Sequence, residues 1–313
     1  MRYQTGEKIT FTVNRPLGDA RPRRLCDYVA ARLGISGKRA DRLGALGAVK
    51  FNGETVAEKT ARPVTRGDVF TIEIPADWLP HLVETPMALA ILYEDEFFIA
   101  VNKPSGILVH PARGHAFGDS LQNGVLWHYR ADRRPDKTIA PPHRLDKDTS
   151  GAMLFSRSQK SYIALCRMFK NREVRKTYWA LVEGSPPWDA TTADAPLGVH
   201  PQNPTIGAVV ADGKTARTEF IVKRRGEKMS LVEASPHTGR AHQIRLHLQH
   251  LGYPIIGDRD YNPDSAIAFP RQALHALSLA FVHPLTGTPL TIAAPLAADF
   301  AAGMQEIGKA TTN

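Results

Sequence analysis

The first eighty residues place apolar side chains at helical spacing and then at strand spacing. The apolar face of one expected helix consists of Leu25, Tyr28, Val29 and Leu33, and Gly34 would end this helix. Residues 38–47 follow as a second short helix with a basic face. Residues 49–53 and 67–74 have the composition and spacing of strands. This order predicts a small, separate α/β domain over residues 1–80.

Residues 81–90 carry few periodic signals and are expected to form a linker. Beyond them, short apolar runs predict many strands. The expected strands are residues 91–93, 97–101, 174–184, 216–222 and 229–234, the last two paired around the turn 224–228. Within residues 174–184, we expect Tyr178, Ala180 and Val182 to share one face, because alternate residues of a strand point the same way.

Two helices are expected among these strands. Ser158 can cap a helix whose apolar face is Ile163, Cys166 and Phe169, with Tyr162 and Leu165 alongside. A second helix carries the stripe Ile244, Leu248 and Leu251 and stops at Gly252. Many unevenly spaced strands with few helices predict an α+β domain with a mixed, mostly antiparallel sheet flanked by helices and loops. We expect it to span residues 91–302, with residues 303–313 as a C-terminal tail.

Length and composition limit the class of protein. A chain of 313 residues, 42% of them hydrophobic, can bury a full core and suggests two domains. Cys26 and Cys166 are its two cysteines, so neither a disulfide framework nor a cysteine zinc site is expected. No apolar run approaches the roughly 20 residues that span a bilayer, and the start lacks the apolar stretch of a signal peptide. We therefore expect a cytoplasmic protein, monomeric and without membrane contact.

The charge of the chain favours a polyanionic partner. The formal net charge is +9, and residues 1–80 hold 14 basic against 9 acidic residues, a net of +5. Basic residues near one edge of the small domain, expected to grip an RNA backbone, are Arg32, Lys38, Arg39 and Arg42. Two helices followed by a strand ribbon resemble the S-four-type RNA-binding domain, named for a ribosomal protein, over about residues 20–76.

A dense group of charges lies at residues 143–151, between Pro141-Pro142 and the apolar residues 152–155. This arrangement predicts a turn that presents charge where a strand begins, and such loops often carry chemistry. The alternative is a solvated surface turn. Asp148 and Thr149 are expected to fix the turn through side-chain hydrogen bonds to the backbone.

A second charged group lies at residues 238–252, on the expected helix with the stripe at Ile244. His242, Arg245 and Gln249 occupy its polar faces. An arginine docked beside a buried loop carboxylate would keep that carboxylate ionised. The spacing of the three histidines in this segment fits no zinc pattern, so no metal is expected.

The segments 143–151, 176–178 and 239–247 match, in this order, the three motifs of the RluA-type RNA pseudouridine synthases. Four further segments, residues 102–111, 257–261, 274–276 and 283–287, also look like that family. The resemblance covers about residues 88–302. It implies the pseudouridine synthase fold and an isomerase that converts uridine in RNA to pseudouridine without a cofactor.

The resemblance also implies roles for individual residues. Asp146 would be the catalytic carboxylate, acting as a nucleophile or removing a ribose proton to start an elimination, and the sequence does not choose between these routes. Arg245 would be its ion-pair partner. Tyr178 would stack on the uracil and assist removal of the proton at carbon five.

Further residues are expected to bind the substrate. Arg144 would fill the space left by the flipped base, because a planar cation can stack there. His143, Lys147 and His242 complete this set, with Lys147 either a phosphate contact or a solvated charge. The extra N-terminal domain favours ribosomal RNA over transfer RNA as the substrate.

Two other functions remain open. Asp146 and Asp148 could form the carboxylate pair of a glycoside hydrolase, but that class does not explain the basic N-terminal domain. A catalytically silent RNA-binding assembly factor would explain that domain, but the presence together of Asp146, Tyr178 and Arg245 argues against lost activity.

Overall fold

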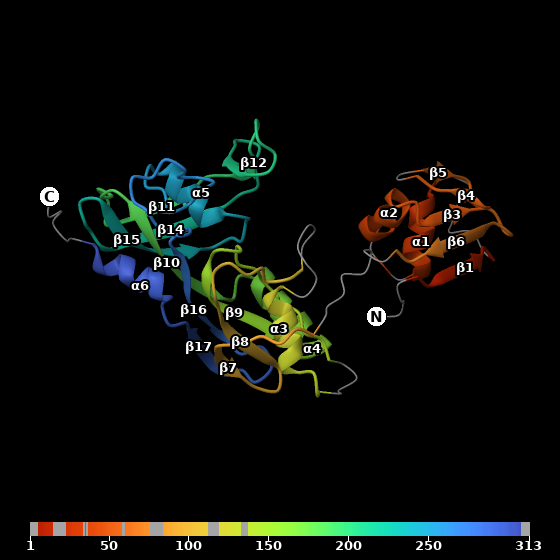
Figure 1. The fold of residues 1–313 in the computed structure, drawn as a ribbon, viewed down its shortest axis with the longest axis horizontal. Helices are drawn as coiled ribbons and strands as arrows, with labels where there is room; N and C mark the ends of the chain where they lie inside the picture. The colour runs from red at the N-terminus through yellow and green to blue at the C-terminus, as the bar shows by residue number, and fades with distance from the viewer. Residues whose placement is uncertain are drawn as a thin grey trace. The chain divides into compact units, whose positions relative to one another are not determined.

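The computed structural model describes residues 6–14, 23–33, 35, 37–57, 60–75, 84–111, 119–132 and 137–307, apart from the side chains of Arg23, Lys38 and Arg39. The chain divides into two compact units, residues 1–81 and 82–313 (Figure 1). Gly34, the expected stop of the first helix, lies outside the described residues. No helix in the described segments is long and apolar enough to cross a membrane.

The first unit packs two helices, α1 (Leu25–Leu33) and α2 (Gly37–Ala45), with a four-stranded sheet. The sheet has the order β1 (Lys8–Thr12), β6 (Val69–Glu73), β3 (Val49–Phe51) and β4 (Glu54–Thr55), and β2 (Arg23–Arg24) pairs with β5 (Ala61–Arg62). Both predicted helices are confirmed. The strand expected at residues 49–53 ends earlier, because Asn52 and Gly53 have φ values of 50° and 88° and form the turn into β4.

The second unit is built on a nine-stranded sheet, which confirms the α+β prediction. Its strands are β7 (Ile91–Glu94), β8 (Phe98–Lys103), β9 (Ser150–Ser156), β10 (Arg175–Glu183), β11 (Ala190–Asp194), β14 (Arg217–Arg224), β15 (Met229–Pro236), β16 (Leu274–Val282) and β17 (Pro289–Ala293). The order is β11-β14-β15-β10-β16-β9-β8-β7, with β17 also beside β16. β16 and β9 run parallel, and the other neighbours are antiparallel.

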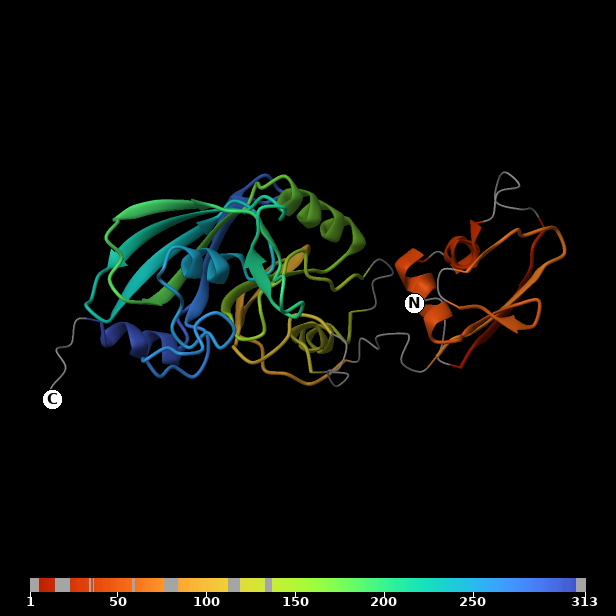
Figure 2. The ribbon, with the colours of Figure 1, turned by 90° about the horizontal axis from the view of Figure 1, so that it is seen from above.

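Helices cover both faces of the sheet where β8 and β9 lie. α3 (Leu121–His128) packs on the face that includes Ile99 and Met153, and α4 (Gln159–Lys170) packs on the face that includes Ala100 and Leu154 (Figure 2). Since both faces are covered, every residue of β9 is buried. α5 (Gln243–His250) and α6 (Ala298–Gln305) complete the unit.

One predicted helix face is wrong in part, and two predicted boundaries are wrong. Ser158 caps α4 as expected, and Phe169 and Leu165 pack on the core, but Ile163 is 59% exposed, because the inner side of this helix continues through Met168. Residues 84–90 are not a free linker, since Met87 and Leu89 pack against the core of the second unit. The second unit also extends beyond residue 302, because α6 reaches Gln305 and Ile307 is fully buried.

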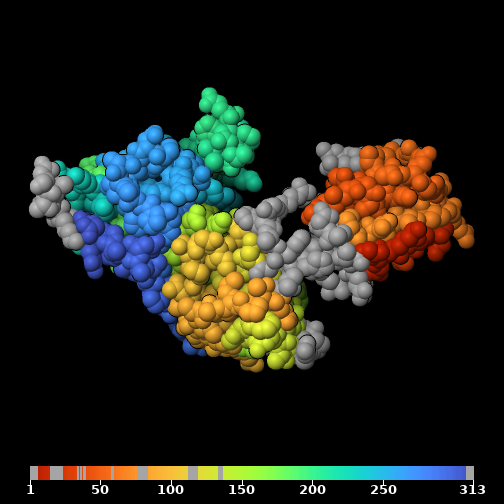
Figure 3. All heavy atoms as spheres, viewed as in Figure 1, coloured from red at the N-terminus to blue at the C-terminus, as the bar shows by residue number. Residues whose placement is uncertain are grey.

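Three local features bring distant segments to one place. At the start of β9, Gly151 has φ 117°, and a Cβ there would lie 2.2 Å from the Ala276 carbonyl oxygen, so glycine allows β9 to approach β16. β10 has a bulge between Thr177 and Tyr178. A hairpin of β12 (Leu197–Val199) and β13 (Gly207–Val209) stands out from the surface of this unit (Figure 3).

Candidate active site

A cleft of about 1070 Å³ opens between the loop before β9, the start of β10 and the N-terminal end of α5. The charged loop contributes Arg144 and Asp146, β10 contributes Tyr178, and the α5 region contributes His242 and Arg245. Arg144 and Arg245, which are 101 positions apart in the sequence, therefore line one space, as expected from the motifs. Sites for small molecules are commonly clefts in which a few polar groups point toward the same space and orient the ligand.

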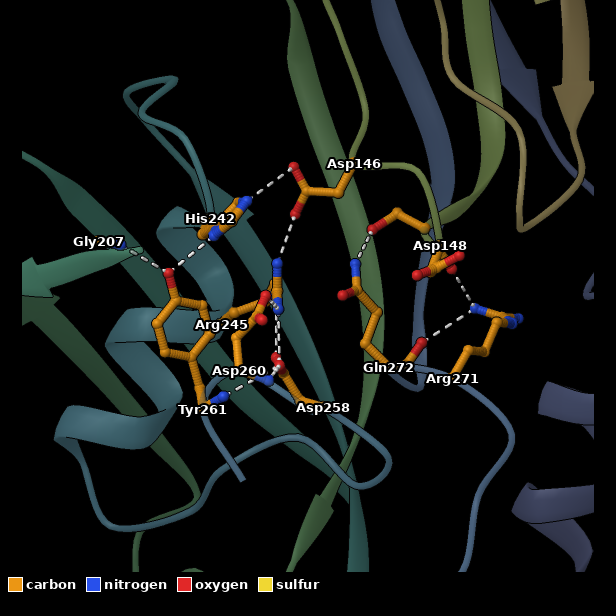
Figure 4. Close-up of polar contacts among 11 residues, drawn as sticks. Asp146, Asp148, Gly207, His242, Arg245, Asp258, Asp260, Tyr261, Arg271 and Gln272 are labelled. Atoms are coloured by element: carbon orange, nitrogen blue, oxygen red, sulfur yellow. Dashed lines mark hydrogen bonds and ion pairs between the residues drawn. The ribbon is translucent and has the colours of Figure 1, made fainter. Parts of the chain in front are cut away.

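Arg245 is the centre of the charge network in this cleft (Figure 4). Its guanidinium is 4% exposed and donates from Nε and Nη2 to both oxygens of Asp258, each at 2.6 Å. Nη2 also lies 2.7 Å from Asp260, and Nη1 lies 3.4 Å from Oδ2 of Asp146. Burial alone would lower the pKa of Arg245, but its hydrogen bonds and ion pairs with Asp258, Asp146 and Asp260 raise it above the ordinary value.

The expected contact between Arg245 and Asp146 is therefore present, but it is the longest of the arginine's four. The bidentate pair with the fully buried Asp258 fixes the guanidinium plane, and Asp146 receives the remaining nitrogen. Sequence reasoning missed the roles of Asp258 and Asp260. Their signal was the segment 257–261, which matched the family but contained no feature that assigned a function to its carboxylates.

Donors from several parts of the chain hold the loop that carries Asp146. The backbone N–H of Thr149 bonds the Asp146 carbonyl at 3.1 Å, and Lys103 Nζ donates to the carbonyls of Lys147 and Thr149 at 2.7 and 2.9 Å. The carbonyls of residues 146–149 all have partners, since Arg271 Nη1 reaches that of Asp148 at 3.0 Å (Figure 4). Saturated backbone groups hold the loop in one shape.

This arrangement differs from the expected one, in which the side chains of Asp148 and Thr149 would fix the turn. The Thr149 hydroxyl instead accepts a hydrogen bond from Gln272 Nε2 at 2.8 Å, and the other donors come from Lys103 and Arg271. A turn that precedes a strand buried on both faces meets donors from several elements, and those donors are distant in sequence.

Lys103, at the end of β8, is fully buried. Besides the two loop carbonyls, its ammonium donates to the Pro104 carbonyl at 2.8 Å. Burial lowers the pKa of Lys103 to about 7, and the charge of Asp148 opposes this shift. Lys103 belongs to the family-like segment 102–111, and no local pattern predicted this role for it.

Tyr178 lies at the bulge of β10 and is buried, with its ring lining the cleft. Bulges re-aim a side chain, which here turns Tyr178 toward the cleft. Burial, and then the charge of Asp146, raise the pKa of the Tyr178 phenol well above its ordinary value. Tyr178 therefore keeps its proton at neutral pH.

Comparison with known proteins identifies the family. The family profile for RNA pseudouridylate synthase matches residues 97–250, which include the loop, Tyr178 and Arg245. The RNA pseudouridine synthase YlyB of Bacillus subtilis is 38% identical over 84% of this chain and 86% of its own length. The chain belongs to the RNA pseudouridine synthases. Like the other members of this family, it is an isomerase that acts on RNA.

Two further relatives of this pseudouridine synthase extend the comparison. The ribosomal large subunit pseudouridine synthase D of Xanthomonas campestris is 35% identical over 77% of each chain. The solved structure of human RNA pseudouridylate synthase domain containing 1 matches with a TM-score of 0.56 and 22% identity, over 71% of this chain and 97% of that one. The second match shows the pseudouridine synthase fold.

The structure also shows where the pseudouridine synthase places the residues expected to bind its substrate. Arg144 is exposed at the cleft, whereas Lys147 is exposed outside the cleft lining. His143 is half-buried, stacks on Phe169 with ring centroids 4.5 Å apart, and accepts the Leu154 N–H at 3.2 Å through Nε2. Burial, and then the charge of Lys176, lower the pKa of His143 to about 3, so it is neutral.

The three histidines near α5 lie in different surroundings. His242 precedes the helix in the left-handed region, with φ 55°, and its Nδ1 lies 2.7 Å from the Tyr261 hydroxyl. His247 is buried between Thr218 Oγ1 at 2.9 Å and the Ala195 carbonyl at 3.0 Å. His250 is exposed at the end of the helix.

In the first unit, the structure describes two of the four basic residues expected to contact RNA. Arg32 is exposed at the end of α1, with its guanidinium 5.5 Å from the centre of the Phe11 ring. Arg42 is half-buried in α2. The side chains of Lys38 and Arg39 lie outside the described part of the structure.

Proposed function

We propose that this enzyme isomerises uridines of ribosomal RNA, with Asp146 as the catalytic carboxylate. The observation that carries the proposal is the position of Asp146, 21% exposed in the cleft, on a loop whose carbonyls are all bonded and beside Arg245. A fixed carboxylate with an adjacent buried cation is suited to a reaction that needs one ionised acid in a defined place.

The reaction breaks the bond between N1 of uracil and C1′ of the ribose, turns the base and joins C5 to C1′. C5 loses its proton and N1 gains one. Asp146 either attacks C1′ or removes a ribose proton, and both routes start from the carboxylate. Arg245, held by Asp258, keeps a positive charge beside it throughout. The chemistry requires no electron transfer.

Tyr178 and Arg144 have complementary roles in this proposal. The buried Tyr178 ring stacks on the uracil. Because its phenol is protonated in the free enzyme, Tyr178 is not the base that accepts the C5 proton unless it first loses its own. Arg144, exposed at the cleft, occupies the space among the stacked bases from which the uridine has flipped out. His143, bonded to Leu154 and stacked on Phe169, positions the loop.

Ribosomal RNA is proposed as the substrate for two reasons. Relatives in Xanthomonas campestris and Nitrosomonas europaea, 35% and 40% identical, carry the name ribosomal large subunit pseudouridine synthase D. The basic first unit resembles a domain named for a ribosomal protein. Transfer RNA is the second candidate.

The test uses ribosomal and transfer RNA transcribed in vitro, which contain no pseudouridine, and maps the product by chemical probing. We expect pseudouridine in the ribosomal transcript, and loss of about a thousandfold or more of the rate in Asp146→Asn. Asp148→Asn is the matched control, because this side chain lies outside the cleft lining and should retain activity.

The other outcomes identify the alternatives. Activity of a folded, RNA-bound Asp146→Asn variant contradicts the assignment of the carboxylate. Binding without conversion indicates an assembly factor, and released sugar indicates a hydrolase. Modification of the transfer RNA alone contradicts the proposed substrate.

The contribution of the first unit is tested by removing residues 1–81. We expect RNA binding to weaken and its salt dependence to flatten, because fewer phosphates are neutralised, while the rate on a short substrate changes little. Unchanged affinity would mean that this unit does not bind RNA.

A further inference from the structure

A chain of polar contacts joins the β12–β13 hairpin to Asp146. The Gly207 N–H of β13 donates to the Tyr261 hydroxyl oxygen at 3.0 Å, and this oxygen lies 2.7 Å from His242 Nδ1. The other ring nitrogen, His242 Nε2, lies 3.9 Å from Asp146 Oδ1 (Figure 4). Asp146 thus faces Arg245 with one oxygen and His242 with the other.

The direction of these contacts decides which nitrogen of His242 carries the proton. Since the Tyr261 oxygen accepts from Gly207, its own proton is free to point at Nδ1 of His242. Burial raises the pKa of Tyr261 and lowers that of His242, so the phenol keeps its proton and the imidazole has only one. With Nδ1 accepting, that proton lies on Nε2, toward Asp146.

We propose that His242 is a positioning residue for Asp146. His242 presents its Nε2–H to the carboxylate of Asp146, and Tyr261 and the hairpin fix this tautomer. The proposal rests on the proposed function of Asp146. The separation of 3.9 Å between Nε2 and Oδ1 is longer than a hydrogen bond, and the proposal requires this contact to shorten when RNA fills the cleft.

Tyr261 supports both partners of Asp146. Its hydroxyl holds His242, and its ring lies under the Arg245 guanidinium, 4.7 Å from the ring centre. The hairpin is closely fitted here, because a Cβ on Gly207 would lie 2.9 Å from Leu246 of α5 and 3.4 Å from the Tyr261 hydroxyl. A shift of the hairpin would therefore act on both Leu246 and Tyr261.

Among the described residues, the charged groups that act on His242 are three carboxylates and one guanidinium. Asp146 faces it from the loop, Asp258 and Asp260 from the segment after α5, and Arg245 from α5 itself. The acidic groups favour a proton on His242, whereas burial and Arg245 oppose a second one. The imidazole is therefore a neutral hydrogen-bond donor. The three carboxylates and one arginine around it give this part of the site a net negative charge.

The first test reads the tautomer and does not depend on activity. Nitrogen NMR of the ¹⁵N-histidine-labelled full chain should show protonated Nε2 and bare Nδ1 for His242, assigned with His242→Gln. In Tyr261→Phe, which keeps the ring under Arg245, we expect a mixture of the two tautomers. A wild-type His242 with its proton on Nδ1 would overturn the proposal, even if the enzyme is fully active.

The second test compares two substitutions that keep different halves of the imidazole. His242→Gln can place an amide N–H near Nε2, toward Asp146, and His242→Asn can place an amide oxygen near Nδ1, toward Tyr261. The single-turnover rate is measured by release of tritium from a ribosomal RNA transcript labelled at C5 of uridine. RNA affinity is measured in parallel.

We expect His242→Asn to lose about tenfold in rate with RNA affinity unchanged, as for one hydrogen bond to a charged group, while His242→Gln stays within about threefold of wild type. If His242 only maintains the fold at its left-handed position, the order reverses, since asparagine tolerates that backbone better. The reversed order would overturn the proposal. An inactive wild type with the Nε2–H tautomer would contradict the proposed substrate and leave the tautomer assignment intact.

Discussion

Two buried cations support the same loop, and they do so in opposite ways. Lys103 is bonded to the backbone carbonyls of Pro104, Lys147 and Thr149, which carry partial charges. Arg245 is bonded to carboxylates, including the fully buried Asp258. Burial lowers the pKa of Lys103 to about 7, whereas ion pairs that outweigh burial raise that of Arg245.

The two kinds of partner suit two different tasks in the active site, which are to fix the path of the loop and to keep a positive charge beside Asp146. Carbonyl partners fix the path of the backbone but compensate little of the charge, so Lys103 is a geometric support that can lose its proton near neutral pH. Carboxylate partners compensate the charge fully, so Arg245 remains a cation beside Asp146 at every physiological pH.

The largest expected effect is from Arg245→Met. The substitution leaves the carboxylate of Asp258 buried without its partner, and we expect a loss of about 3–5 kcal/mol in the free energy of unfolding of the second unit. Denaturant unfolding measures this loss. Arg240→Met is the matched control, because Arg240 is exposed and holds one carbonyl, and it should change stability by less than about 1 kcal/mol. Equal effects of the two substitutions would contradict the proposed division of tasks.

Lys103→Met should be less costly, because it leaves unpaired carbonyls and no unpaired charge. We expect a loss of about 2–3 kcal/mol in the free energy of unfolding, since the Lys147 carbonyl keeps its bond from the Gly106 N–H. Lys176→Met, which removes one bond to the Thr238 carbonyl, should cost about 1 kcal/mol. A Lys103→Met variant as unstable as Arg245→Met would indicate that the lysine also balances buried charge.

The two cations should also differ in pH dependence. The pKa of Lys103 is about 7 in the folded protein and 10.5 in its ordinary state, so between these values unfolding takes up a proton. The free energy of unfolding of the wild type should therefore rise with pH from about 7 to about 10, by up to about 1.4 kcal/mol per pH unit from this group. This contribution decreases as the pH falls from about 10 and is fully lost at about pH 7.

Unfolding curves of wild type and Lys103→Met at several pH values measure this contribution as a difference, which removes groups common to both proteins. Parallel curves would show that Lys103 keeps its proton throughout. Arg245 should contribute no slope in this range, because its pKa is raised.

The smallest effect is expected from Asp260→Asn. The Asp260 side chain is 44% exposed, so its 2.7 Å contact with Arg245 is largely screened by water. We expect a change of less than about 1 kcal/mol in the free energy of unfolding. A larger loss would show that both carboxylates, and not chiefly Asp258, hold the guanidinium.

The features that could be predicted from the sequence are those set by the order of neighbouring residues. The shared face of Tyr178, Ala180 and Val182 follows from alternation along one strand, and all three are buried. It failed at Ile163, because three apolar residues can mark a stripe, but the sheet beneath decides which side of the helix is buried. The strand β1 was not predicted, although its half-buried Ile9 and Phe11 alternate with exposed polar residues.

The candidate site divides in the same way. The motifs indicated that Asp146 and Arg245 meet, and they do at 3.4 Å. Lys103 was not predicted as a support, since lysine reads as a surface residue and its two loop carbonyls are 44 and 46 positions away. Partners of this kind are set by the sheet order, and no local pattern encodes that order.

The hydrogen-bond donors that hold the loop lie far along the sequence, so they are translated long after the loop itself. Arg271 and Gln272, which bond Asp148 and Thr149, lie 123 residues further along, and β16 must be in place before β9 has its parallel neighbour. Contacts of such long range form late. A nascent chain on the ribosome therefore carries Asp146 long before it has a rigid loop to present it, and it becomes competent only when almost all of it has been translated.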